Sequence, residues 1–165
     1  MQKLKVLFVL SLVAYLYGCT STPTLEEPSA EKKDYSKEYQ ADFDSVWSSA
    51  VDWFAVNNIP IKNLERSSGI ITSEYSLGSD FTQVDCGSVS GDSFHVIREK
   101  NVTANISVRV REAGDVVVVR PNVFGDGYYD VWDEMWGGEY MLEPNECIST
   151  GEVERSLHQY IQNKL

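Results

Sequence analysis

The sequence is poor in the residues that carry most of the chemistry in proteins. Its 165 residues include three cysteines and two histidines. It contains no C-x-x-C pair, no H-E-x-x-H sequence, no P-loop and no dinucleotide-binding glycine pattern. Residues 87–91 nearly match a G-x-S-x-G nucleophile elbow, but Val89 stands where the serine should be. We therefore expect a protein that is not an enzyme, with no catalytic residue, no metal site and no cofactor.

Positive charge is also scarce. There are 14 lysines and arginines against 25 aspartates and glutamates, which gives a formal net charge of −11. A surface of this charge repels nucleic acid and anionic lipid head groups. The composition therefore argues against a nucleic-acid partner and against attachment to a membrane through charge.

The apolar run near the N-terminus is too short to span a membrane. Residues 6–17 are apolar except for Ser11, whereas a membrane-spanning helix needs about 20 apolar residues. The run follows Lys3 and Lys5, in the order of charged and apolar regions that is typical of a signal peptide. The sequence therefore predicts a signal peptide over residues 1–18.

The predicted signal peptide ends at Gly18-Cys19, which resembles the lipobox of bacterial lipoproteins. The resemblance implies cleavage after Gly18 and lipidation of Cys19. Because Thr20 and not aspartate follows the cysteine, it also implies a lipid anchor in the cell outer membrane, facing the periplasm. Two or more acyl chains hold a protein firmly, whereas one binds only reversibly. The alternative is an ordinary signal peptide with a chance cysteine.

Cleavage would leave a polar linker and one domain. The linker, residues 19–36, begins with Cys19 and is polar with two prolines, so we expect a flexible tether. Residues 37–165 are then long enough for a single domain. Loss of Lys3 and Lys5 leaves 12 basic residues against 25 acidic ones, a formal net charge of about −13.

The two remaining cysteines, Cys86 and Cys147, predict a disulfide bond. An even number of cysteines in an oxidising compartment is typical of disulfides. The alternatives are half of a metal site or a reactive dyad of Cys86 with His95. Neither has a recognisable further member.

Apolar spacing predicts two helices and an antiparallel sheet. Residues 43–56 carry one apolar stripe at helical spacing, with Asp42 or Asp44 as the N-terminal cap. Residues 59–64 and 70–75 flank a Ser-Ser-Gly turn, which predicts a hairpin. Residues 76–93 are expected to form a long loop.

The second half of the chain continues the pattern. Residues 102–111 alternate as in a strand, and residues 116–119 pair back on them until Pro121 ends the strand or marks a sheet edge. The last helix is predicted to begin with a capping box of Ser149 and Glu152. His158 lies beside its apolar stripe and is expected to face solvent.

These elements predict an α+β fold, a single antiparallel sheet with both helices packed on one face. Residues 43–75 also resemble the opening of the helix-grip domains of BamC-like outer-membrane lipoproteins, in which a helix with aromatic residues precedes a strand, a Ser-Gly turn and a second strand. The resemblance implies this fold and a place among envelope lipoproteins.

Residues 125–146 are the most unusual stretch. They contain seven acids, five tyrosines or tryptophans, and no basic residue. One interpretation is structural, with residues 130–136 forming a short helix whose apolar side chains, Trp132 and Trp136 among them, pack on the sheet. The other is functional, an aromatic platform ringed by carboxylates for a basic partner, a sugar polymer or Ca²⁺. The candidate partner-binding residues are Asp126, Tyr128, Tyr129, Glu139 and Tyr140.

The leading hypothesis is therefore a membrane-anchored envelope lipoprotein that binds or assembles another envelope protein, in outer-membrane assembly or maintenance. The rival is a glycan-binding or cell-wall-active protein that uses residues 125–146, with one carboxylate as an acid.

Overall fold

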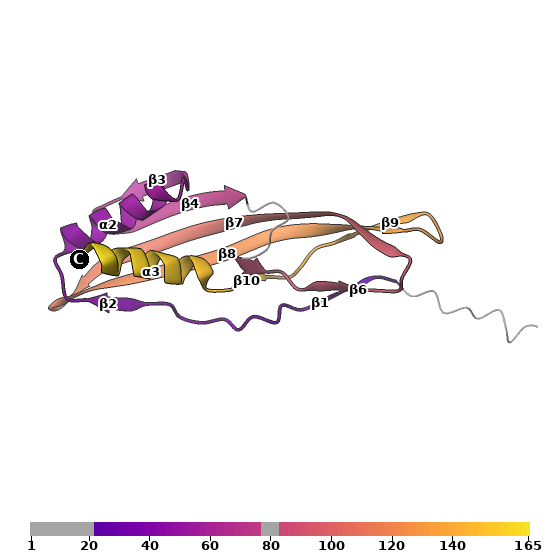
Figure 1. The fold of residues 1–165 in the computed structure, drawn as a ribbon, viewed down its shortest axis with the longest axis horizontal. Helices are drawn as coiled ribbons and strands as arrows, with labels where there is room; N and C mark the ends of the chain where they lie inside the picture. The colour runs from indigo at the N-terminus through magenta and orange to yellow at the C-terminus, as the bar shows by residue number, and fades with distance from the viewer. Residues whose placement is uncertain (1–21, 77–82) are drawn as a thin grey trace, which may run out of the picture.

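A computed structural model describes residues 22–76 and 83–165, so the predicted signal peptide and the predicted lipidation site, Cys19, lie outside the described residues. Within the described residues, both helices pack on one face of a large antiparallel sheet (Figure 1). This confirms the predicted α+β fold. No helix in the described part of the chain is long and apolar enough to cross a membrane.

The helices are α2 (Phe43–Val56) and α3 (Glu152–Lys164). The strands are β1 (Thr24–Glu26), β2 (Lys37–Tyr39), β3 (Ile61–Glu65), β4 (Ile70–Ser76), β5 (Val84–Asp85), β6 (Ser88–Ser90), β7 (His95–Ala113), β8 (Val116–Asp133), β9 (Gly138–Leu142) and β10 (Cys147–Ser149).

Two long strands, β7 and β8, form the spine of the sheet. They are 19 and 18 residues long and are joined by a tight turn at Gly114. The order across the main sheet is β3-β4-β7-β8-β10-β5, while β2 and β9 pair with other parts of β8. Strand β1 pairs separately with β6. Because β7 and β8 extend past both helices, the sheet has a covered end and a projecting end (Figure 1).

The two faces of the spine differ sharply in polarity. The side chains of β7 that face the helices are almost completely buried: Val102, Ala104, Ile106, Val108 and Val110. The alternate positions of β7 carry Thr103, Asn105, Ser107, Arg109 and Arg111 and are half-buried or exposed. This is the alternation predicted for residues 102–111. We call the second face, opposite the helices, the outer face.

Helix α2 spans the predicted residues and buries the predicted stripe. The Asp42 side chain caps it by accepting a hydrogen bond from the Ser45 backbone N–H at 2.9 Å. Phe54 is fully buried, and burial of a side chain of that size contributes roughly 1.5–3 kcal/mol. Trp53 is buried as well, and its indole N–H donates to Ser156 Oγ of α3 at 3.2 Å. The two helices therefore pack on each other as well as on the sheet.

Helix α3 begins at Glu152 without the predicted capping box. Its N-cap is Gly151, which has φ of 78°, while Ser149 still belongs to β10. Ser149 Oγ instead donates to the buried Glu154 carboxylate at 2.8 Å and accepts from the Gly151 backbone N–H at 3.0 Å. The serine thus stabilises the start of the helix through Glu154, two residues beyond the predicted partner.

The predicted hairpin of β3 and β4 is confirmed. Its turn ends at Gly69, which has φ of 67°. A Cβ atom at this glycine would lie 1.8 Å from the Val110 carbonyl oxygen. Gly69 also accepts a hydrogen bond from the Val110 backbone N–H at 2.8 Å. The turn therefore locks the hairpin against β7.

Of the two predicted possibilities for Pro121, a strand end or a sheet edge, the structure shows a local edge and not the end of β8. The strand runs on to Asp133, and Pro121 lies opposite Val108 of β7. On its other side, β2 pairs with residues 117–119 and β10 with residues 124–125. Pro121 lies in the gap between them, where a missing N–H removes no bond to either strand.

The segment expected to be a free tether is attached to the domain over its described part. Residues 22–36 are extended, but Leu25 pairs with Val89 through β1 and β6. The Asp85 carboxylate accepts hydrogen bonds from the Ser29 and Ala30 backbone N–H groups at 2.8 and 2.9 Å. The packed structure therefore already includes residues 24–30, ahead of the boundary predicted at residue 37.

The loop predicted over residues 76–93 also contains regular structure. Strands β5 and β6 lie within it, while residues 77–82 lie outside the described residues. Strand β5 pairs with β10, and Cys86 between the two strands is fully buried. The serines and glycines predicted a loop because short strands with few apolar residues leave little periodic signal.

Candidate functional site

The projecting end of the sheet is a three-stranded ribbon that we call the finger. It consists of residues 95–102 of β7, residues 126–133 of β8, and β9. The described part of β4 pairs with β7 only as far as Thr103, so the finger begins where β4 ends. The finger contains most of the acidic aromatic segment, residues 125–146.

The outer face of the finger contains a shallow hollow of about 430 Å³. It is lined by Asn101, Thr103, Asp126, Gly127, Tyr128, Glu143 and Pro144. Gly127 lies close to the backbone of β7, and a Cβ atom there would lie 2.3 Å from the Asn101 carbonyl oxygen. The absence of a side chain at residue 127 therefore permits the close pairing of the strands beneath the hollow.

Three of the five predicted partner-binding residues share this outer face. Asp126 pairs with Thr103 across the strands, and Tyr128 pairs with Asn101. Glu139 of β9 lies opposite Trp132. Paired residues of an antiparallel sheet point to the same face, so all three side chains are on the side away from the helices. Asp126 and Glu139 are exposed, and the Tyr128 hydroxyl lies 3.4 Å from Glu99 Oε1.

The other two predicted residues face inward. Tyr129 is only 2% exposed and its hydroxyl donates to the Gly87 carbonyl oxygen at 2.8 Å. Burial raises the pKa of Tyr129, and the nearby Asp85 carboxylate adds to this effect. Tyr140 is half-buried and packs edge-on against His95 with ring centroids 5.9 Å apart. The prediction that Tyr129 lies on the surface is therefore wrong, because it is part of the core.

The short helix predicted at residues 130–136 is absent. Residues 130–133 continue β8, and a tight turn then leads into β9. Asp133 is buried and forms the turn, accepting hydrogen bonds from the Met135 and Trp136 backbone N–H groups at 2.8 and 3.0 Å. Met135 and Trp136 are 57% and 72% exposed, so they do not pack on the sheet.

A buried histidine lies beneath the same turn. The His95 Nδ1 atom accepts from the Asp92 backbone N–H at 3.2 Å. Its Nε2 atom is 3.8 Å from Asp133 Oδ2 and has no hydrogen-bond partner among the described residues. His95 and Asp133 pair across β7 and β8 at the end of the finger, so the two side chains lie together beneath the turn without a hydrogen bond between them.

The predicted disulfide is confirmed. Cys86 and Cys147 are bonded, with Cα atoms 4.1 Å apart, and both are buried. The bond joins the start of β10 to the residue that follows β5, next to the finger.

Two opposing effects act on the pKa of the nearby Asp85 carboxylate. Burial raises the pKa of Asp85, but hydrogen bonds from Gly87, Ser29 and Ala30 outweigh it and hold the pKa below its usual value.

His158 is buried, which corrects the expectation that it faces solvent. Its Nε2 lies 2.6 Å from the Tyr35 carbonyl oxygen, and its Nδ1 lies 2.7 Å from the Tyr39 hydroxyl. Because a carbonyl oxygen can only accept, Nε2 carries the proton and the Tyr39 hydroxyl donates to Nδ1. Burial raises the pKa of Tyr39 to about 12 and lowers the pKa of His158. This histidine therefore serves packing and joins the N-terminal segment to α3.

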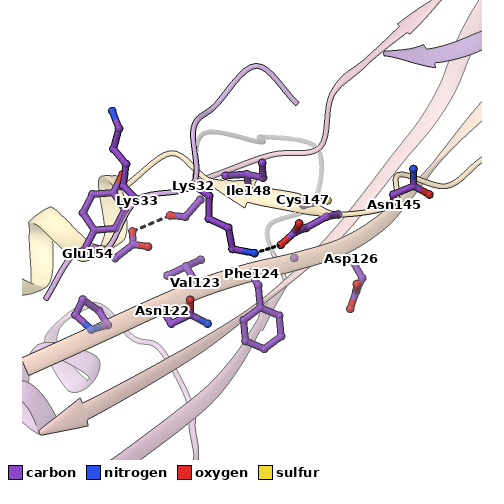
Figure 2. Close-up of a pocket in the computed structure, with 15 residues that line it drawn as sticks. Lys32, Lys33, Asn122, Val123, Phe124, Asp126, Asn145, Cys147, Ile148 and Glu154 are labelled. Atoms are coloured by element: carbon purple, nitrogen blue, oxygen red, sulfur yellow. Dashed lines mark hydrogen bonds and ion pairs between the residues drawn. The ribbon is translucent and has the colours of Figure 1, made fainter. Parts of the chain in front are cut away.

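A second hollow lies where the N-terminal segment crosses the gap between β2 and β10. It has a volume of about 290 Å³ (Figure 2). Lys32 reaches across it, with Nζ 2.6 Å from Glu146 Oε1. At the other end Glu154 accepts from Ser149, and the Phe124 ring points away from Glu154 (Figure 2). No sequence pattern predicts this hollow, because it depends on contacts of residues 29–36 with β8 and β10.

The structure also shows where the reactive groups considered from the sequence lie. Cys86 is bonded to Cys147, which excludes the Cys86–His95 dyad in this state. Val89 lies in β6, so the glycine-rich stretch around it is part of a strand pair. Among the described residues no cluster of three histidine, cysteine, aspartate or glutamate side chains could hold a metal ion. No protein-family model and no curated protein sequence matches this chain.

Proposed function

We propose that this chain is a lipid-anchored lipoprotein of the bacterial envelope that binds another envelope protein and catalyses no reaction. The lipobox-like Gly18-Cys19 supports the anchor, and Thr20 supports placement in the outer membrane. The BamC-like pattern of residues 43–75 supports a role in outer-membrane assembly or maintenance.

One observation carries the binding role, the uncovered outer face of the finger. Met141 is 64% exposed there, and Phe124 at the edge of the finger is 42% exposed. They flank the hollow that contains Asp126 and Tyr128. Exposed apolar side chains grouped among charged ones are typical of protein interaction sites.

The charges on this face indicate the charge of the surface that a partner would present. The exposed carboxylate of Glu139 lies two residues from Met141 on the same face of β9, and Asp126 and Glu143 line the hollow. The Arg98 guanidinium stacks over the outward-facing Trp132 ring, 3.9 Å from the ring centroid, so it lies on that ring and not in the hollow. We therefore propose a partner that presents lysine or arginine around an apolar patch, with an association that weakens as salt rises.

The anchor is tested by the Cys19→Ser variant of the full precursor. We expect it to remain uncleaved by the lipoprotein peptidase and unlabelled by fatty acid, because the thiol that would be acylated is gone. Labelling that survives the substitution would refute the lipid anchor.

The binding face is tested by co-purification of the native protein from detergent, followed by identification of bound proteins. Reversing two charges, Asp126→Lys with Glu139→Lys, should reduce partner recovery about tenfold or more, which corresponds to about 1.4 kcal/mol. The matched control reverses Glu112 and Asp115, two exposed acids beside the Gly114 turn at the other end of the spine. Equal loss in both variants would mean that net charge matters and this face does not. A bound sugar polymer in place of a protein would favour the glycan alternative.

A further inference from the structure

The end of the finger carries an exposed apolar group that the proposed binding face does not use. It consists of Phe94, Met135 and Trp136, which we call the tip. Phe94 is 41% exposed and is held beside the turn by its carbonyl oxygen, which accepts from the Glu134 backbone N–H at 2.9 Å. Trp136, at 72%, is the most exposed of the large apolar side chains in the described residues.

The tip is a rigid structure. The Asp133 carboxylate holds the backbone N–H groups of Met135 and Trp136, and the Gly137 N–H donates to the Asp133 carbonyl oxygen at 2.9 Å. Because the Asp133 side chain is buried, its charge points into the protein. The turn therefore presents apolar side chains outward on a fixed backbone, at little entropic cost on binding.

The pairing of β1 with β6 brings the start of the described chain close to the tip. Thr24 of β1 pairs with Ser90 of β6, and Ser90 is only four residues before Phe94. Four residues span at most about 14 Å, and the five residues from Cys19 to Thr24 span at most about 18 Å. Figure 1 shows β1 and β6 toward the same end of the molecule as β9, away from the C-terminus.

We propose that the tip rests in the head-group region of the same membrane that holds the lipid at Cys19, as a second contact. This inference rests on the anchor of the proposed function. A lipid anchor this close to the tip keeps the tip near the bilayer, because β1 is bonded to β6 and cannot swing free. Tryptophan is the side chain enriched at membrane interfaces, where its ring is partly apolar and partly hydrated.

The charge of the tip specifies the lipid. Its exposed ionisable neighbour in the turn is Glu134, and the protein as a whole is strongly acidic. Attraction to anionic lipid therefore plays no part, and the contact is apolar. The tip therefore binds zwitterionic lipid, and anionic lipid weakens this binding. A basic peripheral protein would show the opposite dependence on anionic lipid. Added salt should restore contact with an anionic membrane, since it screens the repulsion.

The test uses the lipidated protein reconstituted in vesicles of phosphatidylethanolamine and phosphatidylcholine whose acyl chains carry bromine. We expect bromine to quench part of the tryptophan emission, and we expect this quenching to be lost in Trp136→Phe. Leu64→Ala is the matched control. It removes an exposed apolar side chain from β3 near the covered end of the sheet and should leave the quenching unchanged. Replacing part of the lipid with phosphatidylglycerol should lower the quenching, and about 0.5 M salt should restore it.

The outcomes separate this inference from the proposed function. Absent quenching in protein that still floats with the vesicles would overturn the tip contact and leave the anchor intact. Equal quenching in wild type and Trp136→Phe would also overturn it, because another tryptophan would then face the lipid. A blue shift of Trp136 emission that needs an added envelope protein would assign the tip to a protein partner. Loss of flotation would refute the anchor, and the tip contact with it.

Discussion

The bond between Cys86 and Cys147 should supply a large share of the domain's stability. It links residues 61 apart in sequence and so closes a ring that contains all of β7, β8 and β9. In the chain-entropy model, closing a ring of this length in the unfolded chain stabilises the folded state by about 4 kcal/mol. A typical domain has a net stability of about 5–15 kcal/mol.

The position of the bond predicts where the protein loosens first. Cys86 is tied to β10 by the disulfide, while β5 beside it has only a two-residue pairing with β10. The Thr150 backbone N–H donates to the Gln83 carbonyl oxygen at 3.1 Å and continues this short contact. Without the bond, residues 83–90 depend on these few hydrogen bonds, on the one from the Tyr129 hydroxyl to Gly87, and on β1. We expect their amide hydrogen exchange to rise before that of the spine.

The measurement is thermal unfolding of the oxidised and the reduced protein. For a domain of this size, about 4 kcal/mol corresponds to a fall in Tm of roughly 12–20 °C. The variant with both cysteines changed to alanine is the control, because its Tm should not respond to reductant. Thiol titration of the denatured, unreduced protein should find Cys86 and Cys147 unreactive. A fall in Tm of less than about 4 °C on complete reduction, or exchange that rises first in α2, would refute the reasoning.

Two further substitutions test the local structure. Gly69→Ala places a Cβ atom against the Val110 carbonyl oxygen, and should cost more than Gly114→Ala, where φ is also positive but nothing lies within 4 Å. In denaturant unfolding, we expect the two variants to differ by about 1 kcal/mol or more in the free energy of unfolding. Equal losses would mean that the positive φ, and not the contact with Val110, sets the cost of each substitution. For His158, burial depresses the pKa below 6.5 and the Lys37 charge adds to this, so the folded state favours the neutral ring. The contribution of the neutral ring to stability is full above pH 6.5 and is lost as the pH falls through the lower pKa of the folded state. We therefore expect His158→Gln to flatten the dependence of the unfolding free energy on pH just below 6.5.

Local sequence patterns predicted those parts of the fold whose signal is local. Helix α2 and the β3–β4 hairpin have regular apolar spacing and capping or turn residues, and both lie where expected. The alternation of residues 102–111 likewise predicted the centre of β7. Pro121 left two possibilities open, a strand end or a sheet edge, because its effect depends on which strands flank it. Sequence alone does not show the gap between β2 and β10.

The acidic aromatic segment could not be resolved because apolar residues occupy both phases of its strand. Tyr129 and Val131 face the core, while Tyr128 and Trp132 face outward. A strand that is apolar on both phases lacks the alternation that identifies it, and four-residue spacings then resemble a helix. Sequence spacing favoured a packed Trp136 and an exposed Tyr129, and the structure reverses both, since one part of the segment is packed and another is exposed. Only the strand register assigns Tyr129 to the first, and Asp126 and Tyr128 to the second.

The N-terminal segment was missed for a different reason, since its own residues bury almost nothing. Its attachment comes from partners far along the chain. Asp85 accepts its backbone N–H groups, Glu146 pairs with Lys32, and His158 donates to the Tyr35 carbonyl oxygen. A polar sequence predicts a tether only if no other part of the fold offers such partners. Because three separate parts of the fold offer them here, residues 24–35 are held against the domain. A lipid on Cys19 would therefore fix which end of the domain faces the membrane, whereas a flexible tether would leave the orientation open.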